Sequence, residues 1–370
     1  MRSKFFPALA VLVGTTIGAG FLGIPYVVSK SGFPIGFAYL VFVFAFLLLT
    51  KLYLGEVILR TNGNHQLSGY AEMYLGKAGK FLMFFAMIFG IYSALIAYLI
   101  GEGQSLSYIF LGNLDYSLYF SLSFWIIMSF LTYIGLKALK KYELKGMFIV
   151  LSLIFLVFIF FFSKVNAENL VYVNLSNMFL PFGVILFSFL AFSALPEVER
   201  ILRGQEKLMK KAIFFGAFIS LVSYIIFTLV IVGVFGRSVP EISTLALGRF
   251  FSFLGVMTMF TAFFSLSLAI RDMFRFDFKL GRFRGWVLCS FVPLILFLLI
   301  YFFKLASFIQ ILSVAGVVSG GLTGILALLM NLKAKQFGSR KPEYSIRINW
   351  VVIAVMSSVF ILAVVMEFLF

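Results

Sequence analysis

The chain has few of the side chains that enzymes and metal sites use most. Its 370 residues include one histidine, His65, one cysteine, Cys289, and only 14 aspartates and glutamates. A single cysteine excludes a disulfide within the chain, and the shortage of ligand-type side chains argues against a metal cluster. A membrane-embedded enzyme would need several such groups in its apolar segments, so we expect no catalytic residues and no cofactor.

Charge is also scarce, whereas apolar side chains are abundant. Only 12% of the residues are charged, 62% are hydrophobic, and 51 are phenylalanine. No soluble domain of this size could bury so much apolar surface, so the composition indicates an all-α polytopic membrane protein. An outer-membrane barrel would show alternating segments of about ten residues. The apolar runs here are continuous and reach helix length for a bilayer, about 20 residues or more.

Eleven apolar runs are long enough to cross a membrane. We place the spans at residues 5–28, 34–59, 81–110, 118–136, 146–163, 177–201, 212–235, 244–270, 286–303, 306–330 and 349–369. The first run lacks a small-residue cleavage site where a signal peptide needs one, so we expect a retained span. The loops are too short for a soluble domain, so we expect one membrane domain over residues 1–370.

Positive charge is concentrated in alternate loops. The net charge is +16, but 24 of the 30 lysines and arginines lie at the N-terminus and in every second loop, and five lie in the loops between. This asymmetry predicts a cytoplasmic N-terminus, an extracellular C-terminus and a place in the plasma membrane. The expected partners are the lipid bilayer and a small molecule, not nucleic acid, and the oligomeric state stays open.

The first span carries an unusual density of helix-breaking residues. Gly14, Gly18, Gly20, Gly23 and Pro25 lie within twelve positions. Glycine costs roughly 1 kcal/mol relative to alanine in a helix interior, and proline about 3 kcal/mol. Non-helical backbone at membrane depth is tolerated only where protein buries it or where it lines a watery cavity. We therefore expect a discontinuous first helix, broken at Gly18-Ala19-Gly20.

The sixth span repeats this pattern. Residues 20–25 read Gly-Phe-Leu-Gly-Ile-Pro and residues 191–196 read Ala-Phe-Ser-Ala-Leu-Pro. Five spans separate the two stretches, so the second crosses the membrane in the opposite direction. This arrangement is typical of two inverted five-span repeats with paired discontinuous helices. We expect the repeats at residues 5–163 and 177–330, with an extra helix at 349–369.

Paired breaks of this kind suit a zwitterion. Half-helix N-termini favour a carboxylate, whereas freed carbonyl groups favour an ammonium group or a cation. No charged side chain lies near either break in the sequence, which favours a neutral, apolar or aromatic amino acid. The candidate binding residues are Thr15, Thr16, Gly18, Ala19, Gly20, Tyr98, Phe187, Ser188, Phe189 and Ala191.

Five residues are candidates for coupling transport to an ion. Thr258, Thr261 and Ser265 share one helical face and could bind sodium together with freed carbonyls, or only hydrogen-bond to their own helix. Glu102 lies inside the third span and could carry a proton, or stay hydrated near the interface. Glu197 could carry a proton or only stabilise the helix N-terminus that follows Pro196.

Two further features have simpler interpretations. Lys51 lies about two turns from the end of the second span, and we expect it to extend to the interface rather than to function at depth. The tenth span is rich in glycine and serine, which allows close helix packing. We expect that span to make a sliding or gating contact and not to bind a ligand.

The motifs resemble those of a known group of permeases. Gly14 to Pro25 looks like the first-span motif of the hydroxy/aromatic amino acid permeases and the wider amino acid/auxin permease group, within the amino acid–polyamine–organocation superfamily. Residues 97–103, Ala-Tyr-Leu-Ile-Gly-Glu-Gly, resemble the third-span motif, with Glu102 in place of a glycine, and residues 196–198, Pro-Glu-Val, resemble the sixth-span signature.

The resemblance implies a five-plus-five, LeuT-like fold. It also implies substrate at both breaks and uptake driven by protons or sodium. Two departures from the group bear on the ion. Sodium-coupled relatives favour adjacent hydroxyls in the eighth span, but here Ala262 follows Thr261. Some proton-coupled relatives carry a lysine in the fifth span, and residues 146–163 contain none. Of the two ions we favour protons.

Besides the membrane-embedded enzyme considered above, three functions compete on this sequence. The first is a secondary active amino acid transporter, which imports by symport and alternating access. The alternative is a sensor or receptor on the same fold that binds an amino acid without moving it, and an ion channel is the third. Exchange of labelled amino acid in vesicles would separate the first from the others.

Overall fold

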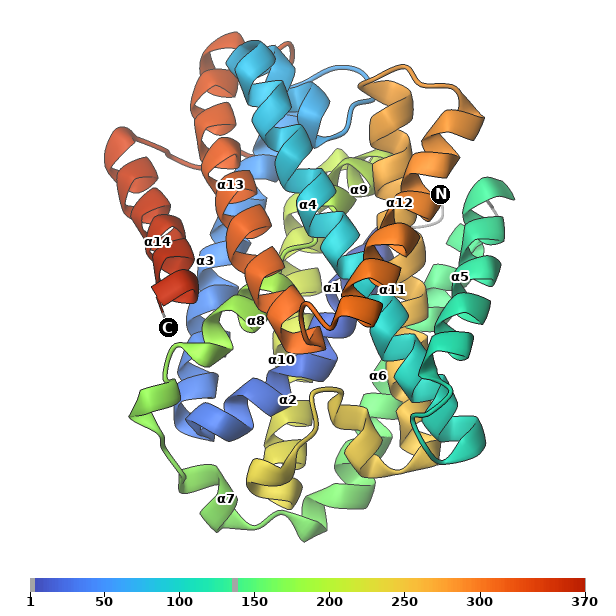
Figure 1. The fold of residues 1–370 in the computed structure, drawn as a ribbon. Helices are drawn as coiled ribbons and strands as arrows, with labels where there is room; N and C mark the ends of the chain where they lie inside the picture. Colours follow the sequence, from blue (N-terminus) through green and yellow to red (C-terminus); the bar gives the residue numbers. More distant parts are fainter. Residues whose placement is uncertain (1–3, 135–138, 370) are drawn as a thin grey trace.

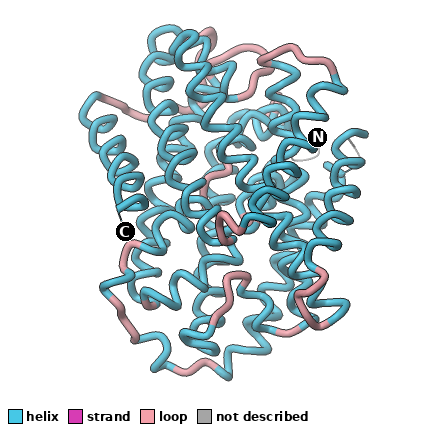
Figure 2. Tube along the Cα trace, in the orientation of Figure 1, coloured by secondary structure: helices cyan, strands magenta, loops and turns pink. Residues whose placement is uncertain are grey.

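The structure is a computed structural model that describes residues 4–134 and 139–369. Figures 1 and 2 show helices joined by short loops, and the described residues contain no strand. The helices are α1 Phe5–Thr16, α2 Ala19–Ser31, α3 Phe33–Leu59, α4 Leu67–Leu111, α5 Ser117–Ile134, α6 Leu139–Phe161, α7 Ala167–Val171, α8 Leu180–Ser188, α9 Leu195–Leu202, α10 Met209–Phe235, α11 Arg249–Phe276, α12 Arg282–Phe303, α13 Phe308–Phe337 and α14 Trp350–Leu369.

The predicted number of spans is confirmed for the described residues. Ten helical segments are long and apolar enough to cross a membrane alone, and α8 and α9 together form one of them. The pair α1 and α2 forms an eleventh segment, bent by 48° at its break. The first and sixth spans are therefore discontinuous.

Several helix boundaries differ from the prediction by five residues or more, and the largest difference is at α4. Helix α4 begins at Leu67, fourteen residues before the predicted span, with a kink at Gly76, whose φ is 73°. Hydropathy missed this extension because it carries Glu72, Lys77 and Lys80. Helix α13 likewise continues to Phe337, beyond the predicted end at residue 330.

A carboxylate from the other repeat stabilises the start of α4. Asp277, which follows α11, accepts hydrogen bonds from the backbone N–H of Gln66 at 3.0 Å and of Gly69 at 2.9 Å, and from Ser68 Oγ at 2.6 Å. Unpaired N–H groups at a helix N-terminus favour an anion. Asp277 therefore attaches the end of α11 to the beginning of α4.

The broken spans occupy the interior and α14 the periphery. The segment from Leu180 to Leu202 is 83% buried within the protein over its most apolar window, whereas Trp350–Leu369 is only 22% buried. Small residues allow close packing in this interior, because a Cβ on Gly316 of α13 would overlap the backbone of α8 at Gly183. Figure 1 shows α1 and α8 among the central helices and α14 at the edge.

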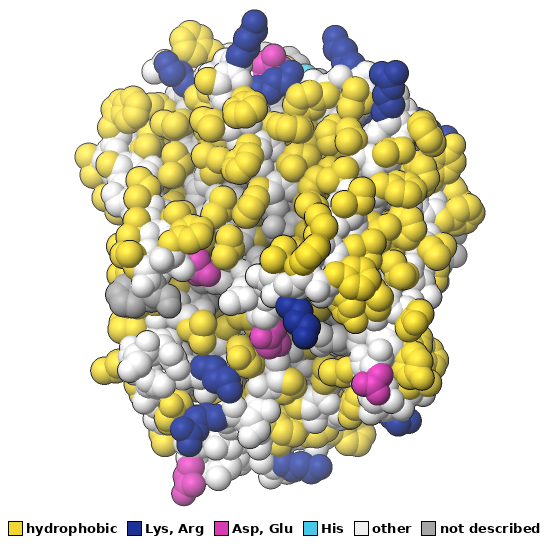
Figure 3. All heavy atoms as spheres, viewed as in Figure 1, with side chains coloured by type: hydrophobic (Ala, Val, Ile, Leu, Met, Phe, Trp, Pro, Cys, Tyr) yellow, Lys and Arg dark blue, Asp and Glu magenta, His cyan; other side chains and the backbone are white. Residues whose placement is uncertain are grey.

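The outer surface of the bundle is apolar. Figure 3 shows hydrophobic side chains over most of the visible flank, with several lysines and arginines gathered at the top and others scattered over the lower half. Phe130 on α5 and Phe155 on α6 are each 61% exposed, although both are strongly hydrophobic. Such a belt is stable against lipid but not against water.

Candidate functional site

The first break lies at Ile17 and Gly18, at the beginning of the predicted segment. Ile17 has a ψ of 83° and Gly18 has φ and ψ of −125° and −142°, so neither is helical. The N–H of Gly18 turns to the carbonyl of Thr16 at 3.1 Å, which removes the regular helical donor of the Gly14 carbonyl. Ala19 and Gly20 belong to the first turn of α2.

The second break lies between α8 and α9. Helix α8 ends at Ser188, and Ala191 has a positive φ of 42° before a short 3₁₀ turn at Phe192–Ala194. Left-handed backbone costs a non-glycine residue about 1–2 kcal/mol, so the surrounding packing must hold it. Helix α9 then begins with Pro196 in its first turn, where a missing N–H costs nothing.

A tyrosine on α10 joins the two breaks. The hydroxyl oxygen of Tyr224 lies 2.7 Å from the carbonyl oxygen of Thr16 and 2.7 Å from that of Ser188. Its ring packs against Phe189 with 4.9 Å between centroids. The sequence analysis missed this residue, although a single tyrosine in the middle of an apolar span was a usable signal.

Tyr98 on α4 contacts the first break from the other side. Its hydroxyl accepts a hydrogen bond from the backbone N–H of Ala19. A Cβ on Gly18 would lie 2.6 Å from the Tyr98 hydroxyl oxygen and 2.9 Å from the Cβ of Ala262. Likewise, a Cβ on Gly20 would lie 2.9 Å from the Cα of Ser188. The backbone of the break is thus enclosed by neighbours that leave no room for a side chain.

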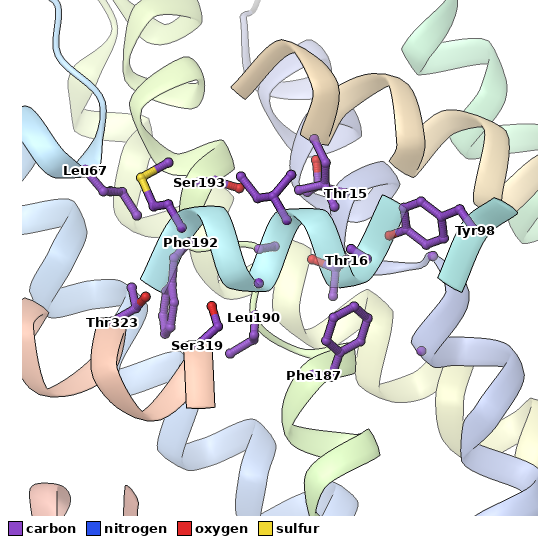
Figure 4. Close-up of a pocket in the computed structure, with 18 residues that line it drawn as sticks. Thr15, Thr16, Leu67, Tyr98, Phe187, Leu190, Phe192, Ser193, Ser319 and Thr323 are labelled. Carbon is purple, nitrogen blue, oxygen red and sulfur yellow. The ribbon is translucent and has the colours of Figure 1, made fainter. Parts of the chain in front are cut away.

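A cavity of about 600 Å³, counted with its opening, lies at these breaks. Figure 4 shows its side chains converging from α1, α4, α13 and the segment between α8 and α9. The lining residues are Thr15, Thr16, Gly18, Gly20, Leu67, Met87, Gly90, Ile91, Ala94, Tyr98, Phe187, Leu190, Ala191, Phe192, Ser193, Leu266, Ser319 and Thr323. None carries a charge, so hydroxyls and freed backbone groups provide the polar contacts.

Seven of the ten predicted binding residues line this cavity. They are Thr15, Thr16, Gly18, Gly20, Tyr98, Phe187 and Ala191. The other three do not line it. Ala19 binds Tyr98 through its N–H, Ser188 Oγ donates to the Val184 carbonyl at 2.6 Å, and Phe189 packs behind the break on Tyr224.

The tenth span, which was expected to make a packing contact and not to bind a ligand, contributes to the cavity wall. Ser319 and Thr323 of α13 line the cavity, because α13 packs directly against α8 and α4. Five residues of α4 between Leu67 and Ala94 were also missed. Their only signal was the spacing of apolar residues on one helical face, which packing alone would also produce.

Two of the predicted cation ligands lie beside the first break. Thr261 and Ser265 line a small second cavity together with Val13, Gly14 and Ile17. The Thr261 hydroxyl donates to the carbonyls of its own helix, to Met257 at 3.1 Å and Thr258 at 3.0 Å, which leaves oxygen lone pairs facing away.

Thr258 differs from these two hydroxyls. It is fully buried, donates to the Gly255 carbonyl at 2.9 Å and does not line this cavity. This hydrogen bond matches the alternative interpretation, in which the hydroxyl only donates to a carbonyl group of its own helix.

The ionisable candidates are more deeply buried than expected. Glu102 is 0% exposed, and neither carboxylate oxygen has a hydrogen-bond partner among the described residues, so it is not a hydrated interfacial group. Glu197 lies in the first turn of α9, as predicted, and is 7% exposed.

The expectation that Lys51 extends to the interface is wrong, because the side chain is only 2% exposed. Residues 338–349 cover this end of α3. The Tyr344 hydroxyl donates to the Leu52 carbonyl at 2.8 Å and the Ile346 N–H to Glu56 Oε2 at 2.9 Å.

Comparison with solved structures identifies the fold. The chain superposes on the crystal structure of MhsT in complex with L-phenylalanine with a TM-score of 0.70, over 100% of this chain and 98% of that one, at 16% identity. The predicted LeuT-like, five-plus-five fold is thereby confirmed.

Comparison with characterised sequences gives more limited matches. "Tyrosine-specific transport system 2" of Haemophilus influenzae is 30% identical over 108 residues, which cover 29% of this chain and 27% of that protein. "Glutamine transporter 2" of Aliivibrio fischeri is 23% identical over 242 residues, which cover 63% and 62% of the two chains. The chain thus spans less than two thirds of the length of either relative.

The family assignment rests on a longer match. Residues 1–246 match the tryptophan/tyrosine permease family, and this region contains both helix breaks, Tyr98 and Tyr224. It covers more than half of the sequence, in agreement with the permease motifs. The chain therefore belongs to the tryptophan/tyrosine permease family.

Proposed function

We propose that the protein is a secondary active transporter that imports a neutral, apolar or aromatic amino acid. The observation that carries this proposal is the uncharged cavity at the paired breaks. Amides of the first turn of α2, near Gly18 and Gly20, would receive the substrate carboxylate. Carbonyl groups at the C-terminal end of α8 would receive its ammonium group.

The lining favours an aromatic side chain. Tyr98, Phe187 and Phe192 offer ring faces, and the cavity contains no Asp, Glu, Lys or Arg that would pair with a charged side chain. Burying an unpaired charge costs several kcal/mol, so lysine or glutamate should bind poorly. Two relatives named for tyrosine or glutamine and a structural neighbour that holds L-phenylalanine agree with a neutral substrate.

For the coupling ion we favour protons over sodium. Glu102 is on the same helix as Tyr98, four residues and about one turn further along α4, and it is buried without a partner among the described residues. A buried carboxylate in that setting is stable when protonated and costly when charged. Arg249, at the start of α11, lies against Gly112 at the C-terminal end of this half of α4. Glu102 would carry the proton.

Sodium remains the alternative ion. The small cavity beside Thr261 and Ser265 has few oxygen ligands, and Ala262 offers none. Hard cations prefer several oxygen ligands, so a weak site there would depend on carbonyls freed at the first break. Glu197 is the other carboxylate that could bind a proton.

Transport assays in liposomes test the proposal. Purified protein should accumulate labelled L-tyrosine, L-phenylalanine or L-tryptophan under an inward proton gradient without sodium. Glu102→Gln should lose this accumulation by about 5- to 150-fold, the usual range of a coupling free energy. It should retain exchange of labelled for unlabelled substrate. Glu72→Gln, on the exposed surface of the same helix, is the control.

Three outcomes would contradict the proposal. Binding without any exchange would favour the sensor. Accumulation that follows a sodium gradient and ignores the proton gradient would move the coupling site to Thr261 and Ser265. Strong uptake of lysine or glutamate would refute the interpretation of the uncharged cavity.

A further inference from the structure

A groove on the flank of the molecule lies apart from the central cavity. It is bounded by α3, the start of α8, α13 and α14, and encloses about 1320 Å³ of empty space, counted with its open side. Figure 1 shows α14 at the edge of the bundle, with its C-terminal end beside the start of α8. Its walls carry Phe42 of α3 and Leu362 of α14, and its polar lining includes Gln310, Ser313 and Glu367.

The body of this flank groove is apolar and faces the membrane. Phe42 is 47% exposed and Leu362 is 55% exposed, and they stand on opposite walls, α3 and α14. Both belong to membrane-crossing helices. In a bilayer such a space fills with acyl chains, because water there would have few polar partners.

One carboxylate interrupts this apolar surface. Glu367 Oε2 accepts a hydrogen bond from Ser313 Oγ at 2.7 Å. The same oxygen lies close to α8, because a Cβ added to Gly183 would lie 2.8 Å from it. Within the described residues no Lys, Arg or His nitrogen comes within 4.0 Å of Glu367.

Glu367 lies where a negative charge without a nearby cation is energetically unfavourable. It lies in the last turn of α14, where the helix dipole is negative and an acidic side chain is disfavoured by about 0.3–1 kcal/mol. Lys30, at the same end of the molecule, uses its ammonium group elsewhere, donating to the Arg237 carbonyl at 2.8 Å. The carboxylate therefore has room and electrostatic reason to accept a cation from outside the chain.

Neutral polar groups lie at one end of the groove. Ser176 and Asn177 precede α8, and Gln310 lies in the first turn of α13. Amide and hydroxyl groups of this kind can donate to a phosphate. The groove thus combines an apolar wall, one carboxylate and a neutral polar rim, which matches a zwitterionic phospholipid in shape and charge.

We propose that the flank groove binds a phospholipid whose headgroup carries a primary ammonium, with the ammonium on Glu367 and an acyl chain along α14 and α3. A primary ammonium donates charge-assisted hydrogen bonds to a carboxylate. A trimethylammonium headgroup has no N–H and cannot. The site therefore distinguishes phosphatidylethanolamine from phosphatidylcholine. The inference does not depend on the proposed transport activity.

Native mass spectrometry of the intact protein tests this site. Protein is released from bilayers of equal parts dioleoyl-phosphatidylethanolamine and dioleoyl-phosphatidylcholine, and the retained lipids are counted. We expect the ethanolamine lipid to be retained about tenfold or more over the choline lipid, as for a hydrogen bond to a charged group. Glu367→Gln should remove this preference, whereas Glu72→Gln should keep it.

A second variant keeps the test decisive if Glu367→Gln folds poorly. Leu362→Trp fills the exposed edge of the groove and leaves the carboxylate in place, so retention of both lipids at this site should fall. Equal retention of the two lipids by the unchanged protein would overturn the proposal. So would displacement of the lipid by soluble ethanolamine at equal concentration, because it would identify a free amine as the ligand.

Discussion

Two glycines determine what the first break can accommodate. Gly18 and Gly20 lie against Tyr98 and Ser188 so closely that an added Cβ would fall inside contact distance. Gly14 differs, because a Cβ there would meet nothing within 4 Å. The glycine-rich motif therefore contains both enclosed and open positions.

Substitution at Gly18 should abolish uptake without preventing membrane insertion. Gly18→Val places a branched side chain where the Tyr98 hydroxyl and Ala262 already lie, so the break must shift and the backbone contacts with substrate are lost. Gly18→Ala should reduce uptake less. Radiolabelled uptake, with surface expression measured in parallel, checks both. Gly285→Ala is the control, because its nearest new contact is 3.8 Å away. Normal uptake by Gly18→Val would show that the first break is not part of the substrate site.

Removing the hydroxyl that joins the breaks should also impair transport. Tyr224→Phe leaves the carbonyls of Thr16 and Ser188 without their shared donor, at a cost of about 1–3 kcal/mol. We expect a 5- to 150-fold loss of substrate affinity. Tyr92→Phe is a matched control, since it removes a hydroxyl-to-carbonyl bond of 2.8 Å to Leu288 away from the cavity. Thermal-shift titration with L-phenylalanine measures the affinity, and equal losses in the two variants would reduce Tyr224 to a packing role.

The residue-level success of the sequence analysis has a physical explanation. Glycine and proline act locally, so the first break could be located within two residues, and the lining positions Thr15, Thr16, Gly18 and Gly20 followed from it. Ser319 and Thr323 reach the cavity, and Tyr224 reaches the two breaks, only through the packing of distant helices, which no local pattern encodes. Lys51 was misplaced for the same reason, because its burial depends on packing between helices and not on its distance from the end of the span.

At the scale of helices, the contact between Asp277 and α4 links the two repeats. The carboxylate of Asp277 accepts three hydrogen bonds at the N-terminus of α4. It therefore takes the role that an N-cap side chain next to α4 in the sequence would otherwise have. The same helix carries Tyr98 and much of the cavity wall. The start of α4 therefore depends on Asp277, which hydropathy analysis treats only as a charged residue in a loop.

Loss of this contact should destabilise the protein. Asp277→Ala leaves the N–H groups of Gln66 and Gly69 without their acceptor, and hydrogen bonds to a charged group contribute about 1.5–3 kcal/mol each in favourable cases. We expect a clear decrease of the apparent Tm in detergent. Asp115→Ala, an exposed loop substitution, should leave the Tm unchanged. Equal Tm values for the two variants would show that α4 begins without help from Asp277.

At the scale of the whole molecule, alternate loops meet at common ends. The Lys4 ammonium donates to the Arg203 carbonyl, and the Arg340 N–H donates to the Arg60 carbonyl at 3.1 Å. At the opposite end, the Asn174 N–H donates to the Ser31 carbonyl at 2.8 Å. These contacts agree with the predicted alternation of spans and show that the lysine- and arginine-rich loops share one end. Which end faces the cytoplasm follows only from the charge rule.

Single-cysteine labelling should determine the orientation. The native Cys289 is 2% exposed and gives little background with a membrane-impermeant maleimide. Glu168→Cys lies in the short exposed helix α7 at the lysine-poor end, and Lys341→Cys in an exposed loop at the lysine-rich end. Because lysine-rich loops stay in the cytoplasm, intact cells should be labelled at Glu168→Cys and at Lys341→Cys only after permeabilisation. The reverse pattern would contradict the predicted orientation and place the lysine-rich loops outside the cell.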